Sequence, residues 1–479
     1  MELTIILAVP LILSAAGLFV KKNEGLANLN CLGYLLSLIF SISAGYRFLS
    51  APGSLSVDGL SLFFVFTIST VAFAAALYSG GYIEHEISRN LITKEKARLY
   101  YPLFNLFVFA MLLVTTVNNL GLMWVAIEIT TLVSAFLVGF HNNKNSVEAA
   151  WKYIIICSVG ITLALLGTIL FSYAFVFSTG AKSLNWTELF SAASRLNPEI
   201  VKIAFIFIII GYGTKAGLAP MHTWLPDAHS QALSPISALL SGVLLKTSIY
   251  AILRYGLIAD KCLGGSYVSH LLILFGMLSL LVSAGLVLVQ KDIKRLLAYS
   301  SIEHIGIIAL GFGIGGPIGT YGALLHMFNH AVTKSLLFFG VGNIVNVYGS
   351  RNIRSIRGAL RALPFSGLMV TAGIFALAGF PPFSIFFSEM MILLAAFSRG
   401  YAVLGCAMLF FIVIIFGAVI YYFSQVLFGE KPKNIVPYKE PLPGRLAFLF
   451  LLVFILVSGW AVPVLLDGLI RSVLILKGI

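Results

Sequence analysis

The sequence consists mainly of long apolar runs separated by short polar segments. Apolar runs of about twenty residues recur along the whole chain, and each can cross a hydrocarbon core about 30 Å thick. The pattern predicts an all-α integral membrane protein with about fourteen transmembrane helices. Some runs are too long for one straight span, and we expect those helices to be broken. The predicted helices cover residues 3–20, 27–48, 59–79, 101–118, 120–140, 149–176, 199–218, 233–255, 266–289, 297–315, 318–348, 365–397, 401–428 and 445–466.

The composition agrees with a membrane protein. Of the 479 residues, 59% are hydrophobic and 10% charged, and the mean hydropathy is +1.00. Soluble domains carry about 25% charged residues. The polar gaps are shorter than the usual minimum for a soluble domain, so we expect a single polytopic domain over residues 1–479. The first apolar run lacks a basic start and a small-residue cleavage site, which favours a first helix over a cleaved signal.

The basic residues indicate the orientation of the helices. The net charge of +13 comes from Lys and Arg in short loops, which is a membrane pattern and not a nucleic-acid-binding surface. If the predicted loops are numbered from the N-terminus, nineteen basic residues lie in odd loops and nine in even loops or tails. This bias predicts odd loops on the cytoplasmic side and both termini on the opposite side. The four cysteines lie far apart and show no metal-ligand spacing.

Two proline-containing segments interrupt the apolar pattern. The first is Lys215-Ala-Gly-Leu-Ala-Pro220 with the residues to Gln231, and the second is Gly379-Phe-Pro381-Pro382-Phe383. Proline removes a backbone donor, and freed backbone groups at membrane depth must be buried or line a watery cavity. Paired broken helices in two halves of a chain indicate inverted repeats with an ion site between them. Ordinary proline kinks are the alternative, because prolines are common in membrane helices.

Five ionisable residues fall inside predicted helices: Glu128, Lys215, Lys246, Lys334 and Glu389. A charge at the bilayer centre costs roughly 2.5–3.5 kcal/mol on insertion scales, so such residues must pair or face water. Pairing of Glu128 with Lys215 or Lys246 would reduce the cost. Structural ion pairs that join helices are one interpretation, but ionisable residues within a membrane usually mark ion pathways.

The type of the interior basic residues favours proton transfer. They are all lysines, whereas every arginine is expected in a loop or near a helix end. A buried lysine can lose and regain a proton, and arginine cannot. His326, His330 and Lys334 are spaced i, i+4, i+8 on one helix face. With His304 they predict a file of titratable groups, although a lone buried histidine is more often a structural core residue.

No catalytic motif accompanies these residues. There is no nucleotide-binding or hydrolase fingerprint and no set of redox-centre ligands, so we expect no cofactor and no bond chemistry in this chain. His222 and His229 flank Trp224-Leu-Pro-Asp227, but their spacing is loose for a zinc site and no cysteine lies nearby.

The segment Gly213-Thr-Lys-Ala-Gly-Leu-Ala-Pro-Met-His-Thr-Trp-Leu-Pro-Asp-Ala-His229 resembles the signature of a known family. These are the antiporter-like membrane subunits of respiratory complex I, Mrp sodium/proton antiporters and group 4 membrane-bound hydrogenases. Ser241-Gly-Val-Leu-Leu-Lys246, Ser300-Ser-Ile-Glu-His304 and the segments around Glu128, His330 and Glu389 are similar too. The resemblance covers residues 55–430.

This resemblance implies two inverted five-helix repeats, at about 101–255 and about 266–428, with discontinuous helices near 215–231 and 379–389. It implies that Glu128 and Lys215 form the ion pair of the first half and that Lys246 links the halves. His304, His330 and Lys334 would continue the polar axis to Glu389 at the exit. Glu389 replaces a lysine that some members carry, which leaves the coupled ion open.

The stretch Val138–Gly160 looks most similar to component F of hydrogenases and formate hydrogenlyases. The implied partners are other membrane subunits, including antiporter-like siblings, lipid and a peripheral hydrogenase or redox arm on the cytoplasmic side. A complex I or Mrp subunit is the alternative within the family. A solute symporter acting alone and a purely structural membrane anchor are the alternatives outside it.

Overall fold

The computed structural model describes residues 1–20, 22–433, 435 and 440–479. Within these residues the chain is helical and has no strands. Lys21 and Lys439, two of the basic loop residues counted above, lie outside the described residues. The helices are α1 (Glu2–Phe19), α2 (Asn23–Ser50), α3 (Gly59–Ser88), α4 (Lys94–Thr116), α5 (Leu120–Val138), α6 (Lys144–Thr179), α7 (Trp186–Ser191), η1 (Ala193–Arg195), α8 (Pro198–Ala216), α9 (Leu225–Gln231), α10 (Ser234–Leu239), η2 (Leu240–Leu244), α11 (Leu245–Leu263), α12 (Ser266–Val287), α13 (Ile293–Ile314), α14 (Gly316–Tyr348), η3 (Ile353–Ser355), α15 (Ala359–Ala362), α16 (Pro364–Leu377), α17 (Ser384–Ser398), α18 (Ala402–Leu427), α19 (Leu442–Trp460) and α20 (Val464–Lys477).

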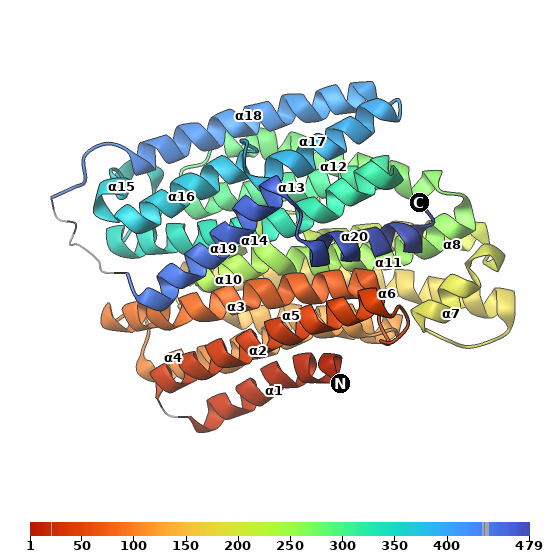
Figure 1. Ribbon diagram of the computed structural model, residues 1–479, viewed down its shortest axis with the longest axis horizontal. Helices are drawn as coiled ribbons and strands as arrows, with labels where there is room; N and C mark the ends of the chain where they lie inside the picture. The colour runs from red at the N-terminus through yellow and green to blue at the C-terminus, as the bar shows by residue number, and fades with distance from the viewer. Residues whose placement is uncertain (21, 434, 436–439) are drawn as a thin grey trace.

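The long helices lie side by side along one direction (Figure 1), as expected for a membrane-spanning bundle. In the described part of the chain, twelve helices are long and apolar enough to cross a membrane, and α16 and α17 are shorter apolar helices. The prediction of an all-α integral membrane protein is therefore confirmed. The total of fourteen spans and the inverted repeats stay predictions. Both termini lie in the right-hand half of the view in Figure 1.

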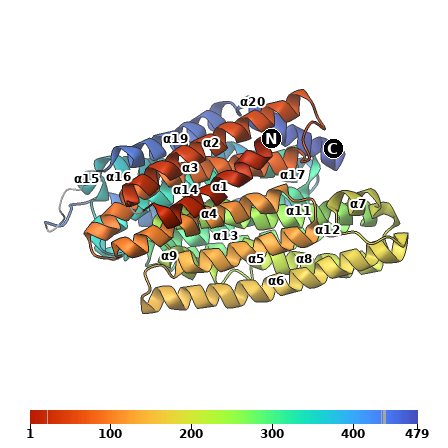
Figure 2. The ribbon, with the colours of Figure 1, turned by 90° about the horizontal axis from the view of Figure 1, so that it is seen from below.

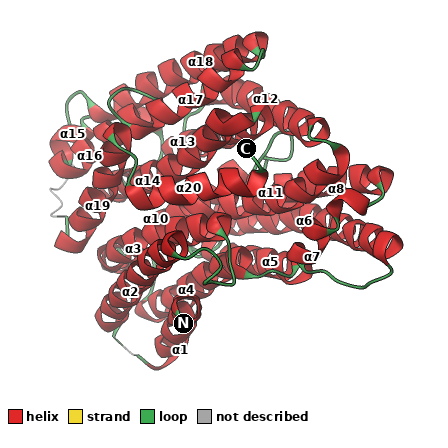
Figure 3. Ribbon diagram, turned by 45° about the vertical axis from the view of Figure 1, so that its right-hand side comes forward, coloured by secondary structure: helices red, strands yellow, loops and turns green. Residues whose placement is uncertain are grey.

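Burial separates central helices from peripheral ones. In the most apolar stretch of α13 all residues are buried, and in that of α3 89% are buried. In the corresponding stretch of α18 only 28% are buried. Helices α11 and α14 cross the middle of the bundle in Figure 3, and α6 forms the lower edge in Figure 2. The central helices are therefore shielded from lipid, and a polar side chain on them must find partners within the protein.

Polar side chains at the helix starts define where several spans begin. Asp58, Thr93, Asn119 and Asn197 each accept a hydrogen bond from a backbone N–H in the first turn of the following helix. Asn143 forms a reciprocal capping box at the start of α6. Such caps satisfy backbone donors that the helix leaves free and stabilise a helix by about 1 kcal/mol each.

Both predicted discontinuities are present. Helix α8 ends at Ala216, and Gly217 has φ +80°, a left-handed conformation that glycine adopts without steric cost. The chain then forms the short α9 before it re-enters the bundle at α10. In the second half, α16 ends at Leu377, and Gly379 at φ +67° precedes the start of α17. The predicted helix over 365–397 is thus two helices.

A third discontinuity was not predicted. The sequence indicated one helix over 445–466, but α19 ends at Trp460 and α20 begins at Val464. Pro463 stands at the N-cap of α20, where the missing backbone N–H is tolerated. This third break packs against the second break. A Cβ atom on Gly459 would be 2.1 Å from the carbonyl oxygen of Pro382, so the two backbone segments are in close contact. Close backbone contact at this point therefore requires glycine.

Two helices are longer than predicted, and each adds a buried basic residue. Helix α13 begins at Ile293 and not at 297, which places Lys294 in its first turn, buried. Helix α11 runs to Leu263 and not to 255, so Arg254, which lay at the end of the predicted helix, is a buried residue in the interior of the observed one. The prediction that the interior basic residues are all lysines was wrong. Hydropathy underestimated both helices because the charged residues near their ends lower the local average.

Candidate functional site

Lys215 lies in the last turn of α8, fully buried beside the first break. Its amino group donates hydrogen bonds to the hydroxyls of Thr131, at 2.8 Å, and Tyr153. The Nζ atom also lies 4.6 Å from the centre of the Tyr153 ring. The partners come from α5 and α6, so three helices of the first half meet at this lysine.

Glu128 lies on α5, half-buried, one turn before Thr131. Its carboxylate accepts a hydrogen bond from Ser158 Oγ at 3.2 Å. Among the described residues, no basic side chain comes within 4.0 Å of it, so the expected direct ion pair with Lys215 is absent. The Lys215 ammonium reaches the hydroxyls of Thr131 and Tyr153 instead. Sequence reasoning did not find Tyr153, because a tyrosine in an apolar helix carries no distinct signal.

Lys246 lies on α11, directly after the π-helical turn η2. Its Nζ donates to the Ser241 carbonyl oxygen at 2.6 Å and lies 2.6 Å from His330 Nδ1 on α14. A π-turn leaves one carbonyl without its usual helical partner, and such turns are frequent at functional sites. The turn therefore supplies an acceptor for the buried ammonium. The link from Lys246 to His330 joins the two halves of the chain.

Three histidines continue from this contact. The rings of His304 and His330 have centroids 4.6 Å apart. His304 Nδ1 lies 2.9 Å from His326 Nε2, and His326 Nδ1 lies 2.9 Å from Ser388 Oγ. All three rings are fully buried. The predicted i, i+4 face of α14 thus carries His326 and His330 toward α13, and the structure brings the histidines into one file.

Lys334, one turn beyond His330 on α14, is fully buried as well. Its Nζ donates to the Leu297 carbonyl oxygen at 2.8 Å and to Ser300 Oγ, both on α13. Like Lys215 and Lys246, it is hydrogen-bonded to neutral oxygen atoms and not to a carboxylate. A lysine held in this way can release its proton without leaving an unpaired carboxylate behind.

Glu389 lies in α17 after the second break, buried. A Cβ on Gly379 would be 2.4 Å from Glu389 Oε2, so the break and the carboxylate are in close contact. A small cavity of about 10 Å³ is lined by Glu389, Ser300 and Glu303. Glu303 was not among the predicted site residues. It immediately precedes His304 and is buried, so its position in an apolar helix was the signal that could have identified it.

One group of side chains has the geometry to hold a cation. One donor atom from each of His304, His326 and Glu389 lies within 4.8 Å of the other two. The two histidines are hydrogen-bonded to each other, through His304 Nδ1 and His326 Nε2. Both ring nitrogens of His326 are already hydrogen-bonded, to His304 Nδ1 and to Ser388 Oγ, so the arrangement fits proton exchange between the rings better than metal binding.

Residues 117–417, more than half of the chain, match the family described as NADH:quinone oxidoreductase/Mrp antiporter, TM. Residues 44–91 match the N-terminal part of chain 5 of NADH-ubiquinone oxidoreductase (complex I). The chain belongs to the NADH:quinone oxidoreductase/Mrp antiporter family. As a member of that family it is a multi-pass membrane protein.

Relatives of this antiporter-family chain include hydrogenase components. It is 41% identical over 434 residues to the hydrogenase-4 component F homolog of Methylacidiphilum infernorum (isolate V4), which covers 89% of this chain and 90% of the relative. It is 31% identical over 349 residues to hydrogenase-4 component B of Escherichia coli (strain K12), over 70% of this chain and 50% of the relative.

The fold is shared with chains of solved membrane complexes. A chain of the membrane-bound sulfane sulfur reductase, an archaeal respiratory membrane complex, has a TM-score of 0.85 and 25% identity, with 99% of this chain and 98% of that chain covered. A chain of the Mrp complex from Dietzia sp. DQ12-45-1b has a TM-score of 0.86 and 21% identity, with 99% and 97% covered, which shows a common fold.

The antiporter-family chain also contains an ion pair between a buried arginine and a partly buried aspartate that the sequence did not indicate. Arg254 donates to both carboxylate oxygens of Asp58 at 2.6 Å, and its guanidinium lies over the rings of Trp186 and Tyr250. A bidentate pair of this kind positions helices and compensates a buried charge. Arg254 is therefore held by an ion pair, whereas Lys215, Lys246 and Lys334 are hydrogen-bonded to neutral groups.

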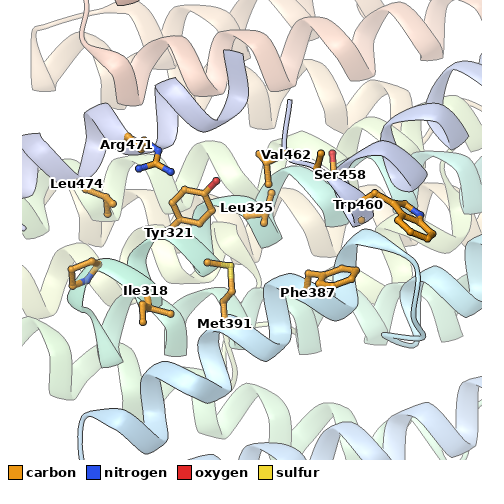
Figure 4. Close-up of a pocket in the computed structure, with 13 residues that line it drawn as sticks. Ile318, Tyr321, Leu325, Phe387, Met391, Ser458, Trp460, Val462, Arg471 and Leu474 are labelled. Carbon is orange, nitrogen blue, oxygen red and sulfur yellow. The ribbon is translucent and has the colours of Figure 1, made fainter. Parts of the chain in front are cut away.

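A larger cavity lies beside the second and third breaks (Figure 4). Its volume is about 450 Å³, and most of its wall is apolar, with Leu325, Phe387 and Trp460 among the lining residues. Tyr321 donates a hydrogen bond to Asp467 at 2.7 Å near one end. Leu325 and Phe387 line the cavity, and each immediately precedes a member of the hydrogen-bonded His326–Ser388 pair. The cavity therefore lies close to the histidine file.

Proposed function

We propose that this chain is a proton- or sodium-translocating, antiporter-like subunit of a membrane-bound respiratory redox complex. The match to the antiporter family and the hydrogenase-4 relatives support this assignment and favour a complex of the hydrogenase or formate hydrogenlyase type. The proposed path uses Glu128, Lys215, Lys246, His304, His326, His330, Lys334 and Glu389.

The observation that carries the proposal is the file from Lys246 through His330 and His304 to His326. Four fully buried titratable side chains lie in contact, and none forms an ion pair with a carboxylate among the described residues. Structural charges in a membrane are usually paired, because an unpaired charge is costly. Groups that exchange a proton with one another need no permanent counter-ion.

The energy for translocation must come from a partner, because the sequence contains no motif for a redox centre. Moving one charge against 100 mV costs about 2.3 kcal/mol. We propose that sibling membrane subunits transmit this energy from a peripheral hydrogenase or redox arm. The solved relatives are chains of multi-subunit membrane complexes, which supports membrane subunits as partners.

We propose the cell membrane as the location, with the basic loops and the peripheral arm on the cytoplasmic side and both termini on the other. The excess of basic residues in odd loops supports this orientation. A reporter that is active only in the cytoplasm, fused to the C-terminus, tests it. An inactive fusion is expected, and an active one would reverse the orientation.

The test of the proposed function is ion uptake into inverted membrane vesicles that contain the intact complex. A pH dye and a sodium indicator would report which ion moves when the redox substrate is added. We expect uptake with the natural chain and loss of uptake with Lys246→Ala. The matched control is Lys182→Ala, which removes an exposed lysine from the loop before α7. Normal uptake by a fully assembled Lys246→Ala complex would disprove a role of this chain in translocation.

The alternative functions give different results in this assay. A structural anchor predicts that Lys246→Ala reduces assembly and leaves the uptake per assembled complex unchanged. A symporter acting alone predicts uptake by the purified chain without the redox partner. A complex I or Mrp-type subunit predicts the same lysine dependence but association with a different set of proteins.

A further inference from the structure

The cavity in Figure 4 carries charge at one end only. Arg471 of α20 lies at one end, Trp460 and Phe387 lie at the other, and Tyr321 lies between them. Among the described residues that line the cavity, Arg471 is the one charged residue. The opposite end offers a single neutral hydroxyl, that of Ser458 near Trp460. The cavity is therefore amphipathic along its length.

The charged end lies where two membrane-spanning helices begin. Pro317, in the first turn of α14, lines the cavity. Gly59, the first residue of α3, packs against Ser472, the neighbour of Arg471. Helices that span a bilayer begin near its surface. Arg471 is therefore near the membrane surface, which is the non-cytoplasmic surface in the proposed orientation.

The apolar end lies deep in the membrane. Arg399, the C-cap of α17, packs against Gly316 at the start of α14, so it marks the same surface. Phe387 lies more than three helical turns before Arg399 on α17, a distance of roughly 18 Å. The hydrocarbon core is about 30 Å thick, so the cavity extends about one leaflet deep.

The Arg471 guanidinium is positioned at the cavity and has unused donors. Its Nε atom donates to Asp467 Oδ2 at 2.8 Å, and the other Asp467 oxygen accepts from the Tyr321 hydroxyl. Within the described part of the chain, the two terminal nitrogens of Arg471 have no hydrogen-bond partner, and the side chain is 70% exposed. The planar fork of a guanidinium matches the oxygen atoms of a phosphate.

We propose that this cavity binds an anionic phospholipid of the non-cytoplasmic leaflet. Its phosphate binds Arg471, and one acyl chain follows the cavity toward the third break. The volume of about 450 Å³ lies within the range of about 300–1,000 Å³ that is typical of small-molecule sites. Free phosphate would leave the apolar length of the cavity empty, and an uncharged hydrocarbon would leave the guanidinium without a partner. A phospholipid satisfies both ends.

The bound acyl chain would lie close to the histidine file. Leu325 and Phe387 line the cavity and immediately precede His326 and Ser388. An apolar chain in this position keeps water away from the file on this side. It also supplies the packing contacts that the side chains around an empty cavity lack.

Photo-crosslinking in the intact complex tests the proposal. The complex is reconstituted into phosphatidylcholine nanodiscs that contain a small share of phosphatidylglycerol with a diazirine on one acyl chain. Mass spectrometry of peptides then locates the adducts. We expect adducts on Phe387, Met391 or Trp460, which unlabelled phosphatidylglycerol suppresses and inorganic phosphate does not. Phosphatidylcholine with the same diazirine chain should label these residues about tenfold less, because its ammonium group offsets the charge of its phosphate.

Two variants separate the role of the charge from the role of the cavity. Arg471→Gln removes the phosphate-binding fork, and we expect labelling by phosphatidylglycerol to fall about tenfold, as for loss of a hydrogen bond to a charged group. The matched control is Arg195→Gln, an exposed arginine of η1 outside the cavity, which should keep normal labelling. Ala461→Phe places a ring in the cavity and retains Arg471, so it should reduce labelling by both lipids.

Two results would overturn the proposal. Equal labelling by the two lipids, unchanged in Arg471→Gln, would mean that bulk lipid only wets this groove. Absence of adducts on the cavity residues of the natural complex would mean that another subunit covers the cavity. If Arg471→Gln does not assemble, Ala461→Phe and the comparison of the two lipids on the natural complex decide the question. None of these results depends on ion uptake, so the proposed function is tested separately.

Discussion

Lys246 Nζ lies 2.6 Å from His330 Nδ1, although 84 residues separate the two along the chain. The contact joins α11 to α14. Removal of the His330 imidazole should separate Lys246 from His304.

We expect His330→Asn to reduce substrate-driven ion uptake at least about tenfold, as for loss of one proton-transfer group. The measurement is dye-reported uptake per assembled complex, with His270→Asn, at an exposed histidine of α12, as the control. Uptake equal to that of the control would show that the path does not pass through His330.

Ion uptake should require both the positive charge of Lys215 and the ability of this side chain to release its proton. Lys215→Ala removes the ammonium that bonds Thr131 and Tyr153, and we expect it to abolish uptake without loss of assembly. Lys215→Arg retains the charge but not the proton exchange, so it should fail as well. Tyr153→Phe keeps the lysine and removes one partner, and a partial loss is expected. Full activity of the arginine variant in the vesicle assay would mean that Lys215 is only an electrostatic element.

The Asp58–Arg254 pair should contribute to stability and not to transport. Asp58→Asn leaves a buried guanidinium without its counter-ion, and we expect unfolding to become easier by about 3 kcal/mol. Thermal unfolding of the purified protein in detergent measures this change. Glu199→Gln, which breaks an exposed pair with Lys202, is the control and should have a much smaller effect, because solvent screens exposed pairs. Equal effects of the two variants would contradict the structural role of Arg254.

The same pair predicts a pH dependence. Burial raises the pKa of the Asp58 carboxyl, but the Arg254 guanidinium and hydrogen bonds from Ser61 lower it more, so the pKa lies below the ordinary value of 3.8. A carboxyl whose folded-state pKa is depressed stabilises the fold above its unfolded pKa. Its contribution should be complete above about pH 3.8 and lost as the pH falls through the folded-state value. In Asp58→Asn this part of the acid destabilisation should be missing.

The contact between the second and third breaks should not tolerate a side chain. A Cβ on Gly459 would lie 2.1 Å from the Pro382 carbonyl oxygen, so Gly459→Ala must displace backbone next to Glu389. We expect lower thermal stability and reduced uptake. Gly417→Ala on α18 is the matched control, because no atom lies within 4 Å of its added Cβ. If the two alanine variants are indistinguishable, the breaks are not in functional contact.

The membrane class, the approximate helices and the residues that are costly to bury could all be predicted from the amino-acid sequence. Hydropathy is a local property, since each residue contributes its own transfer free energy, and runs of apolar residues therefore identify spans without knowledge of the fold. Lys215, Lys246, Lys334 and Glu389 were found on the same principle. The breaks at Gly217 and Gly379 were found because glycine and proline act on the backbone where they stand.

The partner that each buried group takes could not be predicted, because it depends on how the helices pack. Lys215 bonds Thr131 and Tyr153 and not Glu128, because the geometry between α5, α6 and α8 brings the hydroxyls closer. The burial of Glu303 and His229, the pairing of Arg254 with Asp58 and the break before α20 depend on contacts between segments far apart in the chain. Such contacts leave no periodic trace in one sequence, since their energy arises only when the helices pack.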